Sequence, residues 1–200
     1  MKILAFTDIH GSATAIGKIR QAVNLHNPDL LVCAGDISMF ERNLAGIMGK
    51  LNRLQKRLLI INGNHENARL LAKTAADLNN IKVIHKRHFI FGDAIFFGYG
   101  GGGFSMTDRG FEKASKRFEN TIAKNSDKKA VLITHAPPYK TRLDKLQGGH
   151  CGNKSIRRFI EKNGISLAIC GHLHENFKKK DFIGKVMVVN PGPFGKIIDL

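Results

Sequence analysis

Five apolar runs in the sequence each end in a cluster of polar residues, and this repetition limits the fold more than any other feature. A short unbroken apolar run is typical of a strand that is buried on both faces. A functionless surface has no reason to place polar side chains only after such strands. The clusters are Asp8-Ile9-His10, Gly35-Asp36, Asn64-His65, Thr134-His135 and Gly171-His172-Leu173-His174. The sequence therefore predicts strands that deliver polar side chains to one set of loops.

The first third of the chain alternates strands and helices. The expected strands at residues 2–7, 30–34 and 58–61 are each followed by apolar residues at helical spacing. Three such units in succession indicate right-handed crossovers on a parallel sheet. In sheets of this kind, the loops at the carboxyl ends of the strands form the site. The first three polar clusters fall in these loops.

The rest of the chain changes character and then returns to this pattern. Residues 87–91 and 94–98 indicate a hairpin with its turn at Gly92-Asp93, and a basic amphipathic helix should run from Thr107-Asp108 to about Lys124. An irregular stretch is expected over residues 139–152. We also expect strands at 81–84, 130–133 and 165–170, a helix that ends at Lys162, and closing antiparallel strands at 177–182, 185–189 and 196–198.

Length and charge add further limits. A chain of 200 residues can bury a sufficient core, so residues 1–200 should form a single domain. The 32 Lys and Arg exceed the 16 Asp and Glu, which gives a net charge of +16. Such a surface attracts phosphates and nucleic acid, although an ordinary solvated basic surface is an equal alternative. The aromatic residues lie mainly in apolar runs, so a stacking platform for single strands is not indicated.

The cysteines and the apolar runs bear on the compartment. Cys33, Cys151 and Cys170 lack the Cys-x-x-Cys spacing and are expected as core residues or free thiols in a reducing compartment. The chain starts with a strand rather than a leader, and no apolar run approaches the ~18 residues of a membrane span. We therefore expect a cytoplasmic protein without a membrane partner, of unspecified oligomeric state.

The polar clusters combine carboxylates, an amide and imidazoles without a thiolate. Such a mixed set suits Mn, Fe, Co, Ni or Zn better than Ca or Mg, which prefer oxygen ligands. Seven side chains are too many for one tetrahedral site, so two metals that share a carboxylate are the economical arrangement. The candidate ligands are Asp8, His10, Asp36, Asn64, His135, His172 and His174.

The motifs Asp-x-His, Gly-Asp, Gly-Asn-His-Glu, a lone His and Gly-His-x-His, in this order over residues 8–174, resemble those of the calcineurin-like metallophosphoesterases. The resemblance implies an α/β fold, a four-layer αββα sandwich with mixed sheets and the metals at the carboxyl ends of strands. It implies one metal on Asp8, His10 and His174, and a second on Asn64, His135 and His172, with Asp36 between them. His65 would contact the phosphate and assist the leaving group.

The resemblance also implies a reaction. Two metals ~3.5–4 Å apart lower the pKa of a bridging water, and the resulting hydroxide attacks the phosphorus of a phosphodiester or phosphomonoester in line. His65 could act as the acid, since histidine titrates near neutral pH. Manganese is our first choice, with Fe, Ni, Co or Zn as alternatives. The expected substrate is a phosphorylated small molecule or a nucleotide, and the net charge of +16 leaves nucleic acid open.

Two departures narrow the family branch. The protein phosphatases of this superfamily carry an Asp-Arg pair where this chain has Met39-Phe40, which argues against a phosphoprotein substrate and leaves only Glu41 and Glu66 as weak candidates to orient His65. Residues 134–171 resemble the small stand-alone prokaryotic branch, and 200 residues leave no room for the capping domain of DNA-repair nucleases. The alternative function is a non-catalytic scaffold or basic nucleic-acid-binding module on the same fold, which would be expected to lack part of the catalytic set.

The other histidines and a glycine run carry weaker signals. His26, His85 and His88 are expected at the surface without a role, whereas His150 lies in a loop that could overhang the site. The run at residues 100–103 lacks the Gly-Lys-Ser/Thr ending of a phosphate loop, so we expect a flexible connection beside the site.

Overall fold

A five-stranded sheet is built by the first third of the chain together with the last strand. Its order is β13-β1-β2-β3-β4, and β1 to β4 run parallel while β13 pairs antiparallel with β1. The computed structural model describes residues 1–200. The strands are β1 (Lys2–Phe6), β2 (Leu30–Cys33), β3 (Leu58–Ile60), β4 (Ile81–Val83) and β13 (Lys196–Asp199). The helices that connect them are α1 (Ala13–His26), α2 (Leu44–Asn52) and α3 (Ala68–Thr74).

A six-stranded sheet, ordered β11-β12-β10-β7-β6-β5, is built by the middle and the last third. Its strands are β5 (Arg87–Phe91), β6 (Ala94–Tyr99), β7 (Lys129–Thr134), β10 (Ile165–Ile169), β11 (Lys180–Ile183) and β12 (Val186–Val189). The other elements of this part are helices α4 (Arg109–Ala123) and α5 (Lys154–Lys162), the short hairpin of β8 (Lys145–Leu146) and β9 (Gly149–His150), and the 3-10 turn η1 (His174–Asn176).

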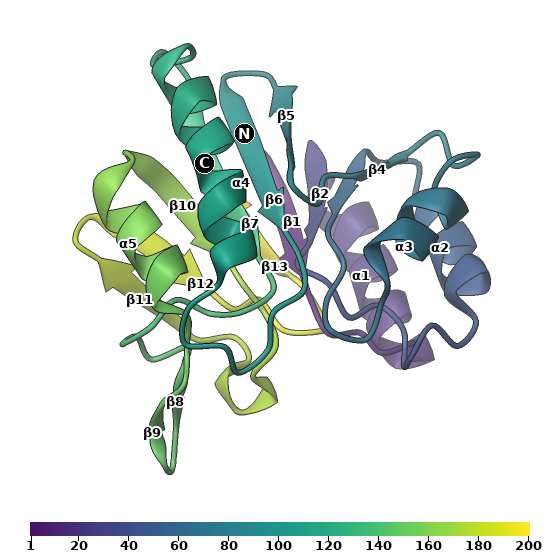
Figure 1. Ribbon diagram of the computed structural model, residues 1–200. Helices are drawn as coiled ribbons and strands as arrows, with labels where there is room; N and C mark the ends of the chain where they lie inside the picture. The colour runs from purple at the N-terminus through teal and green to yellow at the C-terminus, as the bar shows by residue number, and fades with distance from the viewer.

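The two sheets pack face to face, with α1, α2 and α3 outside one sheet and α4 and α5 outside the other (Figure 1). Three apolar clusters follow from this layering. One lies under α1–α3, one lies under α4 and α5, and the central one joins residues of both sheets, such as Val32 and Phe96. Each layer buries its apolar face against the next. The predicted α/β fold, a four-layer αββα sandwich of mixed sheets, is confirmed.

Local sequence signals account for the starts of the helices. The side chains of Ser12, Asp108 and Asn153 each accept a hydrogen bond from a backbone N–H in the first turn of α1, α4 and α5. Such caps satisfy donors that have no partner within the helix. No helix combines the length and apolar composition that crossing a membrane requires.

The predicted closing strands do pair antiparallel, β11 with β12 across the turn at Gly184 and β13 with β1, and β12 also lies parallel beside β10. Two details differ from the sequence predictions. The stretch expected to be irregular contains the hairpin β8–β9, whose two-residue strands are too short to give a periodic signal. The Leu- and Ala-rich sequence after residue 67 predicts a helix to about Leu78, whereas α3 ends at Thr74 and a turn follows over residues 75–77.

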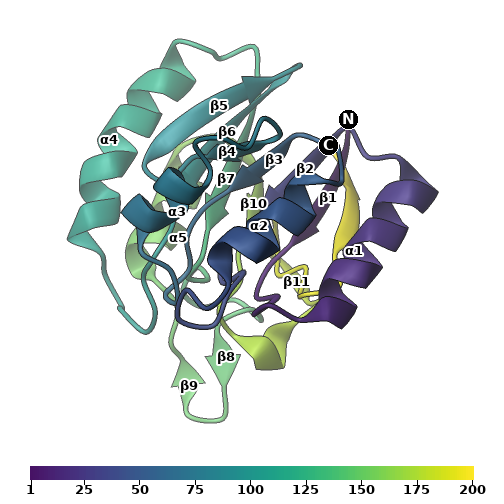
Figure 2. The same cartoon turned by 90° about the vertical axis from the view of Figure 1, so that its right-hand side faces the viewer.

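The carboxyl ends of β1, β2, β3, β7 and β10 meet at one end of the sandwich. β1 and β2 are parallel neighbours, as are β7 and β10, so the loops after them emerge on the same side. This end lies toward the bottom of Figure 1, where the hairpin β8–β9 also projects, and Figure 2 shows the same loops from the side. The polar clusters of the sequence therefore face a common region.

Candidate metal centre

The backbone at the strand ends adopts a conformation that side chains other than glycine rarely take. Asp8, His10, Asp36 and His172 have φ values of 52°, 44°, 53° and 74°, all in the left-handed region. Such conformations cost of order 1–3 kcal/mol each and persist where the surrounding structure imposes them. Strain concentrated in these residues is typical of a functional site.

Two glycines allow the loops to approach one another closely. A Cβ atom on Gly171 would collide with the Thr7 hydroxyl and lie 2.6 Å from an Asp8 carboxylate oxygen. A Cβ on Gly63 would collide with the Asp36 side chain. Both glycines belong to motifs in the sequence, and here each makes room for an adjacent carboxylate.

The first group of candidate ligands comprises Asp8, His10 and His174. The Nε2 atoms of His10 and His174 lie 3.2 Å apart, although the two residues are 164 positions apart in the chain. The Asp8 Oδ1 atom is 3.6 Å from His174 Nε2 and 3.9 Å from His10 Nε2. Asp8 is fixed by a hydrogen bond from the Thr7 hydroxyl at 2.7 Å. The group brings the loop after β1 of one sheet together with the loop after β10 of the other.

The second group comprises Asn64, His135 and His172. The Asn64 Oδ1 atom lies 2.9 Å from His135 Nε2 and 2.9 Å from His172 Nδ1. The other ring nitrogen of His135, Nδ1, lies 2.8 Å from the carbonyl oxygen of Ala34, which fixes the orientation of the fully buried ring. His172 Nε2 is buried without a partner. Three ligand atoms from three loops thus converge.

Asp36 lies between the two groups. Its Oδ2 atom is 3.3 Å from His135 Nε2 and 3.9 Å from His10 Nε2, and its Oδ1 atom accepts a hydrogen bond from the His65 backbone N–H at 2.9 Å. Burial alone would raise the pKa of the Asp36 carboxyl, but the hydrogen bond and charge of His135 outweigh burial and lower this pKa. The carboxylate is therefore ionised at neutral pH.

The surroundings also shift the imidazoles. Burial lowers the pKa of His172 to about 4, with the charge of His135 acting in the same direction. The hydrogen bond to Asp8 raises the pKa of His174. Burial alone would lower the pKa of His135, but its hydrogen bond and ion pair with Asp36 raise it. A cation would compete with these protons, because a histidine binds metal in its neutral form.

The arrangement fits divalent metal ions. Two ligand atoms that are each ~2.1 Å from one ion lie roughly 3.0–3.4 Å apart, and the closest pairs here are separated by 2.9–3.3 Å. Three overlapping sets of side chains have ligand atoms within 4.8 Å of one another, and the sets share Asp8, His10 and Asp36. Nitrogen and oxygen donors without thiolate match transition metals. The overlap matches adjacent ions better than one isolated ion.

His65 lies at the edge of this cluster. Its Nε2 atom is 3.9 Å from Asp36 Oδ2, farther than the closest ligand pairs, and its ring packs edge-on against His10 with the centroids 4.9 Å apart. The Phe40 ring covers the His65 ring, with the two centroids 4.3 Å apart. The Nδ1 atom of His65 is buried without a partner. Packing against rings rather than a carboxylate orients this imidazole.

Neither glutamate that the sequence offered as a partner of His65 contacts its ring. Glu66 is buried, and its carboxylate accepts hydrogen bonds from the backbone N–H groups of Asp36, Ser38 and Gly63 and from the Ser38 hydroxyl, at 2.8–3.0 Å. Glu41 accepts the backbone N–H of Asn67 at 2.7 Å. Glu66 therefore ties the loop after β2 to the loop after β3.

Three aromatic residues at the centre were not predicted. Phe40 covers His65. Phe104 packs against His172 with the ring centroids 4.9 Å apart, and Phe177 stacks on His174 with the centroids 4.8 Å apart. Phe40 and Phe104 are 72% and 64% exposed, which is unusual for phenylalanine and shows that they line an open face. No periodicity marks them, and only their position next to the motifs could have drawn attention to them.

The weaker sequence signals have mixed outcomes. His26 and His88 are exposed, as expected, but half-buried His85 accepts the backbone N–H of Gly100 at 2.9 Å. The glycine run does lie beside the centre, because Phe104 follows it directly. His150 bonds to the buried carboxylate of Asp144 at 2.8 Å. At the start of α5, Arg157 and Arg158 contact carbonyl or carboxylate oxygens, and Asn153 caps the helix.

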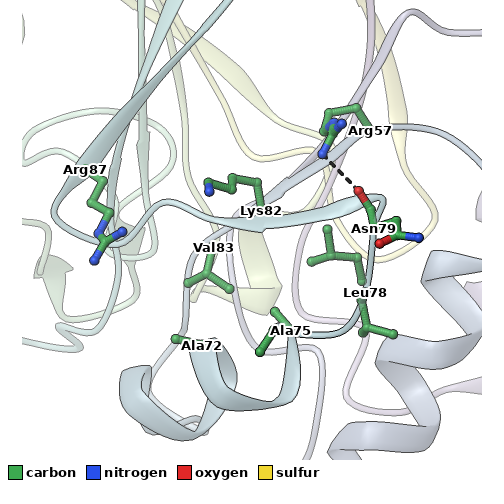
Figure 3. Close-up of a pocket in the computed structure, with 10 residues that line it drawn as sticks. Arg57, Ala72, Ala75, Leu78, Asn79, Lys82, Val83 and Arg87 are labelled. Atoms are coloured by element: carbon green, nitrogen blue, oxygen red, sulfur yellow. Dashed lines mark hydrogen bonds between the residues drawn. The ribbon is translucent and has the colours of Figure 1, made fainter.

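Pockets elsewhere do not involve the cluster. A pocket of ≈ 350 Å³ between α3 and β4 has an apolar floor that includes Ala72, Ala75 and Val83, with Arg57, Lys82 and Arg87 around it (Figure 3). Arg57 donates to the carbonyl oxygen of Asn79 at 3.0 Å. None of the predicted site residues lines this pocket.

Comparison with known proteins gives a family match. The model of the calcineurin-like phosphoesterases matches residues 1–176. The uncharacterized protein MJ1162 of Methanocaldococcus jannaschii is 32% identical to the chain over 206 residues, which cover 96% of the chain and 88% of that protein.

Solved structures share the fold at low identity. The protein TT1561 of Thermus thermophilus has a TM-score of 0.77 at 16% identity, with 96% of this chain and 89% of that chain covered. A protein described as a novel archaeal phosphodiesterase has a TM-score of 0.56 at 19% identity, with 96% and 84% covered. At these identities the likeness extends to the fold alone.

Proposed function

Because the chain belongs to the calcineurin-like phosphoesterase family, we propose that it hydrolyses phosphodiesters, and phosphomonoesters less readily, at a centre with two divalent metal ions. The family implies divalent metals and a hydrolase of phosphate esters. The number of ions, their identity and the preference for diesters are our proposals. The phosphodiesterase among the structures of similar fold supports the diester preference by analogy only.

One observation carries the proposal above all others. Ligand atoms from five strand ends of two sheets converge around Asp36, and the closest pairs of these atoms are 2.9–3.3 Å apart. Without a cation, several of these close contacts would bring two hydrogen-bond acceptors together, which is unfavourable. A structural role for the cluster would favour carboxylates paired with Lys or Arg instead.

We assign each side chain one role. Asp8, His10 and His174 would hold one ion, Asn64, His135 and His172 the other, and Asp36 would contact both. When bound, the ions would activate water and offset the charge of the phosphate oxygens. The buried carboxylates of Asp8 and Asp36 would hold the ions in place, and the Ala34 carbonyl fixes the ring of His135.

His65 would serve the leaving group. Its side chain is 17% exposed and lies at the rim of the cluster, where it can meet a bound phosphate ester. A protonated imidazole donates a proton to the departing oxygen, which is a common role for histidine in catalysis. Phe40 covers the ring and limits its rotation.

The position of Phe40 also supports a substrate other than a phosphoprotein. The protein phosphatases of this superfamily carry an Asp and an Arg at the two positions where this chain has Met39 and an exposed Phe40. An aromatic face can pack against a nucleobase or another flat leaving group. We therefore propose a phosphorylated small molecule or nucleotide as substrate, with nucleic acid as an alternative partner in view of the +16 charge.

Manganese is the first choice for both ions, and iron, nickel, cobalt and zinc also suit the donor set. We place the protein in the cytoplasm because its three cysteines are all free thiols, which suits a reducing compartment.

Hydrolysis of model esters tests the proposal. Protein loaded with Mn, Ni or Co should cleave bis-p-nitrophenyl phosphate faster than p-nitrophenyl phosphate. Failure to cleave either ester with any of these metals would contradict the proposed function. The rival function, a non-catalytic scaffold, predicts that failure, but the complete set of candidate ligands and His65 argues against it.

A further inference from the structure

A pocket of ≈ 420 Å³ is lined by four side chains, and all four are cationic: Arg142, Lys145, Lys179 and Lys180. The salt bridges of lysine and arginine lie elsewhere in the molecule, so none of these four is paired with a carboxylate. Asp181 is nearby, but its Oδ2 atom accepts the backbone N–H of Arg142 at 2.8 Å. Four like charges around one hollow repel one another unless an anion joins them.

The walls of this cationic pocket are held together by a buried amide. Asn176 is fully buried, and its Nδ2 atom donates to the carbonyl oxygens of Leu143 and Lys145 at 2.9 and 3.3 Å. Its Oδ1 atom accepts a hydrogen bond from Lys179 Nζ at 2.7 Å. Asn176 thus links the segment before the hairpin β8–β9 to the segment before β11. The fold therefore sets the spacing of the backbone segments that carry the cations, and it fixes the Lys179 ammonium.

The cationic pocket is connected to the candidate metal centre by one turn. Turn η1 begins at His174, a proposed ligand, and ends at Asn176. A chain spans at most ~3.3–3.6 Å per residue, so the Cα atoms of His174 and Lys179 are less than about 18 Å apart. Figures 1 and 2 both show this part of the chain beside the hairpin β8–β9. A ligand that extends beyond the cleaved ester can reach both places.

We propose that the cationic pocket binds a second phosphate group of the substrate. The inference rests on the proposed phosphoesterase function and narrows its substrate to molecules with at least two phosphates, such as a short oligonucleotide or a nucleotide with a terminal phosphate. Ammonium and guanidinium groups form charge-assisted hydrogen bonds with phosphate oxygens, and several cations match its charge. No hydrophobic residue lines the pocket, and its four cationic side chains favour an anionic group over a base or an acyl chain.

Two related dinucleotides provide the kinetic test. The metal-loaded enzyme is given the dinucleotide adenylyl-adenosine, with and without a 5′-phosphate. Cleavage of the internucleotide bond is followed by chromatography. The phosphorylated form should have a KM lower by about tenfold, because it gains charge-assisted contacts. The K145A/K180A variant should lose this difference, and its backbone carbonyl at residue 145 still accepts from Asn176. A difference that persists in the variant, or is absent from the wild type, overturns the proposal.

The matched control removes two cations elsewhere. Lys113 and Lys116 are exposed on α4 and lie outside the cationic pocket, so K113A/K116A changes the net charge equally. This control should keep the tenfold preference. Equal loss in both variants would mean that the overall charge attracts the substrate and would contradict a localised site.

A binding measurement separates the pocket from catalysis. Sodium tripolyphosphate is titrated calorimetrically into metal-free protein, in which the carboxylates of the centre repel the probe. K145A/K180A should weaken binding at least about tenfold, and K113A/K116A less than about twofold. If neither dinucleotide is cleaved, the proposed activity on dinucleotides fails while this titration still decides the pocket. Unchanged affinity in K145A/K180A would overturn the pocket.

Discussion

At the scale of single residues, four proposed ligands have left-handed backbone conformations that glycine would adopt at lower cost. Asp8, His10, Asp36 and His172 therefore lower the stability of the metal-free fold. A metal that binds only the folded state offsets this cost by mass action. Function and stability oppose each other at these positions.

His65 is the residue whose role is easiest to separate from metal binding. Replacing it with alanine should lower kcat roughly 10²–10⁴-fold, because the leaving group loses its acid. The metal content by elemental analysis should stay at two ions per chain, since the His65 Nε2 atom is 3.9 Å from Asp36 and outside the closest pairs. Loss of an ion would instead assign His65 as a ligand together with His10 and Asp36, with which its ring nitrogen is grouped.

His172 and His174 make a paired prediction. The His172→Ala and His174→Ala variants should each retain about one ion per chain, because the two side chains belong to different groups. The double variant should retain none. His88→Ala, which alters an exposed histidine of β5, should retain two and serves as the control. If both single variants lose the same ion and the double variant still holds the other, our assignment is wrong.

At the scale of elements, the loops depend on a buried glutamate. Glu66→Ala leaves the backbone N–H groups of Asp36, Ser38 and Gly63 without their acceptor, and each lost bond costs about 1–3 kcal/mol. We expect a loss of at least about 3 kcal/mol in the free energy of unfolding, measured by urea denaturation. Glu41→Ala removes a single acceptor from the exposed N-terminal side of α3 and should cost far less. Equal losses would contradict the role of Glu66.

The strand that leads to the glycine run should respond to pH through His85. Burial lowers the pKa of His85 to about 4, and its Nδ1 atom accepts the backbone N–H of Gly100. The neutral form is favoured in the folded state, so its contribution is complete above the unfolded pKa of ~6.5 and is lost as the pH falls toward 4. His85→Asn should remove about 1–3 kcal/mol of the stability change between pH ~6.5 and ~4. His88→Asn should leave it unchanged, and an unaltered slope in His85→Asn would refute the assignment.

Sequence patterns predicted these elements unevenly. A strand was predicted at the position of every strand in the two large sheets, although β11 begins at Lys180 rather than at residue 177. A helix start was predicted at Thr107-Asp108, and Asp108 caps α4. The hairpin β8–β9 was missed because its two-residue strands are too short to give a periodic signal. The parallel pairing of β12 with β10 depends on which edge of the sheet is free, and local sequence carries no information about that.

At the scale of the whole molecule, two sheets supply one centre. Loops after β1, β2 and β3 bring Asp8, Asp36 and Asn64 from one sheet, and loops after β7 and β10 bring His135 and His172 from the other. The motifs therefore identified in advance the side chains that converge at this centre, and the sequence predicted the layers through its resemblance to a family. The covering rings of Phe40 and Phe104, and the carboxylate of Glu66 that ties two loops, were not predictable, because they follow from how the loops fold over one another.

The sandwich also explains why the centre should need both ions. Asp36 is flanked by His10 on one side and His135 on the other, so a single ion would leave one group of ligand atoms crowded without a cation. Hydrolysis should therefore depend on a second equivalent of metal.

A titration of metal-free protein with Mn²⁺, read out as hydrolysis of bis-p-nitrophenyl phosphate, tests the central claim most directly. We predict that the rate rises until two equivalents are bound per chain and then stays constant. A rate that reaches its maximum at one equivalent, or no hydrolysis at any ratio, would contradict the two-ion phosphodiesterase.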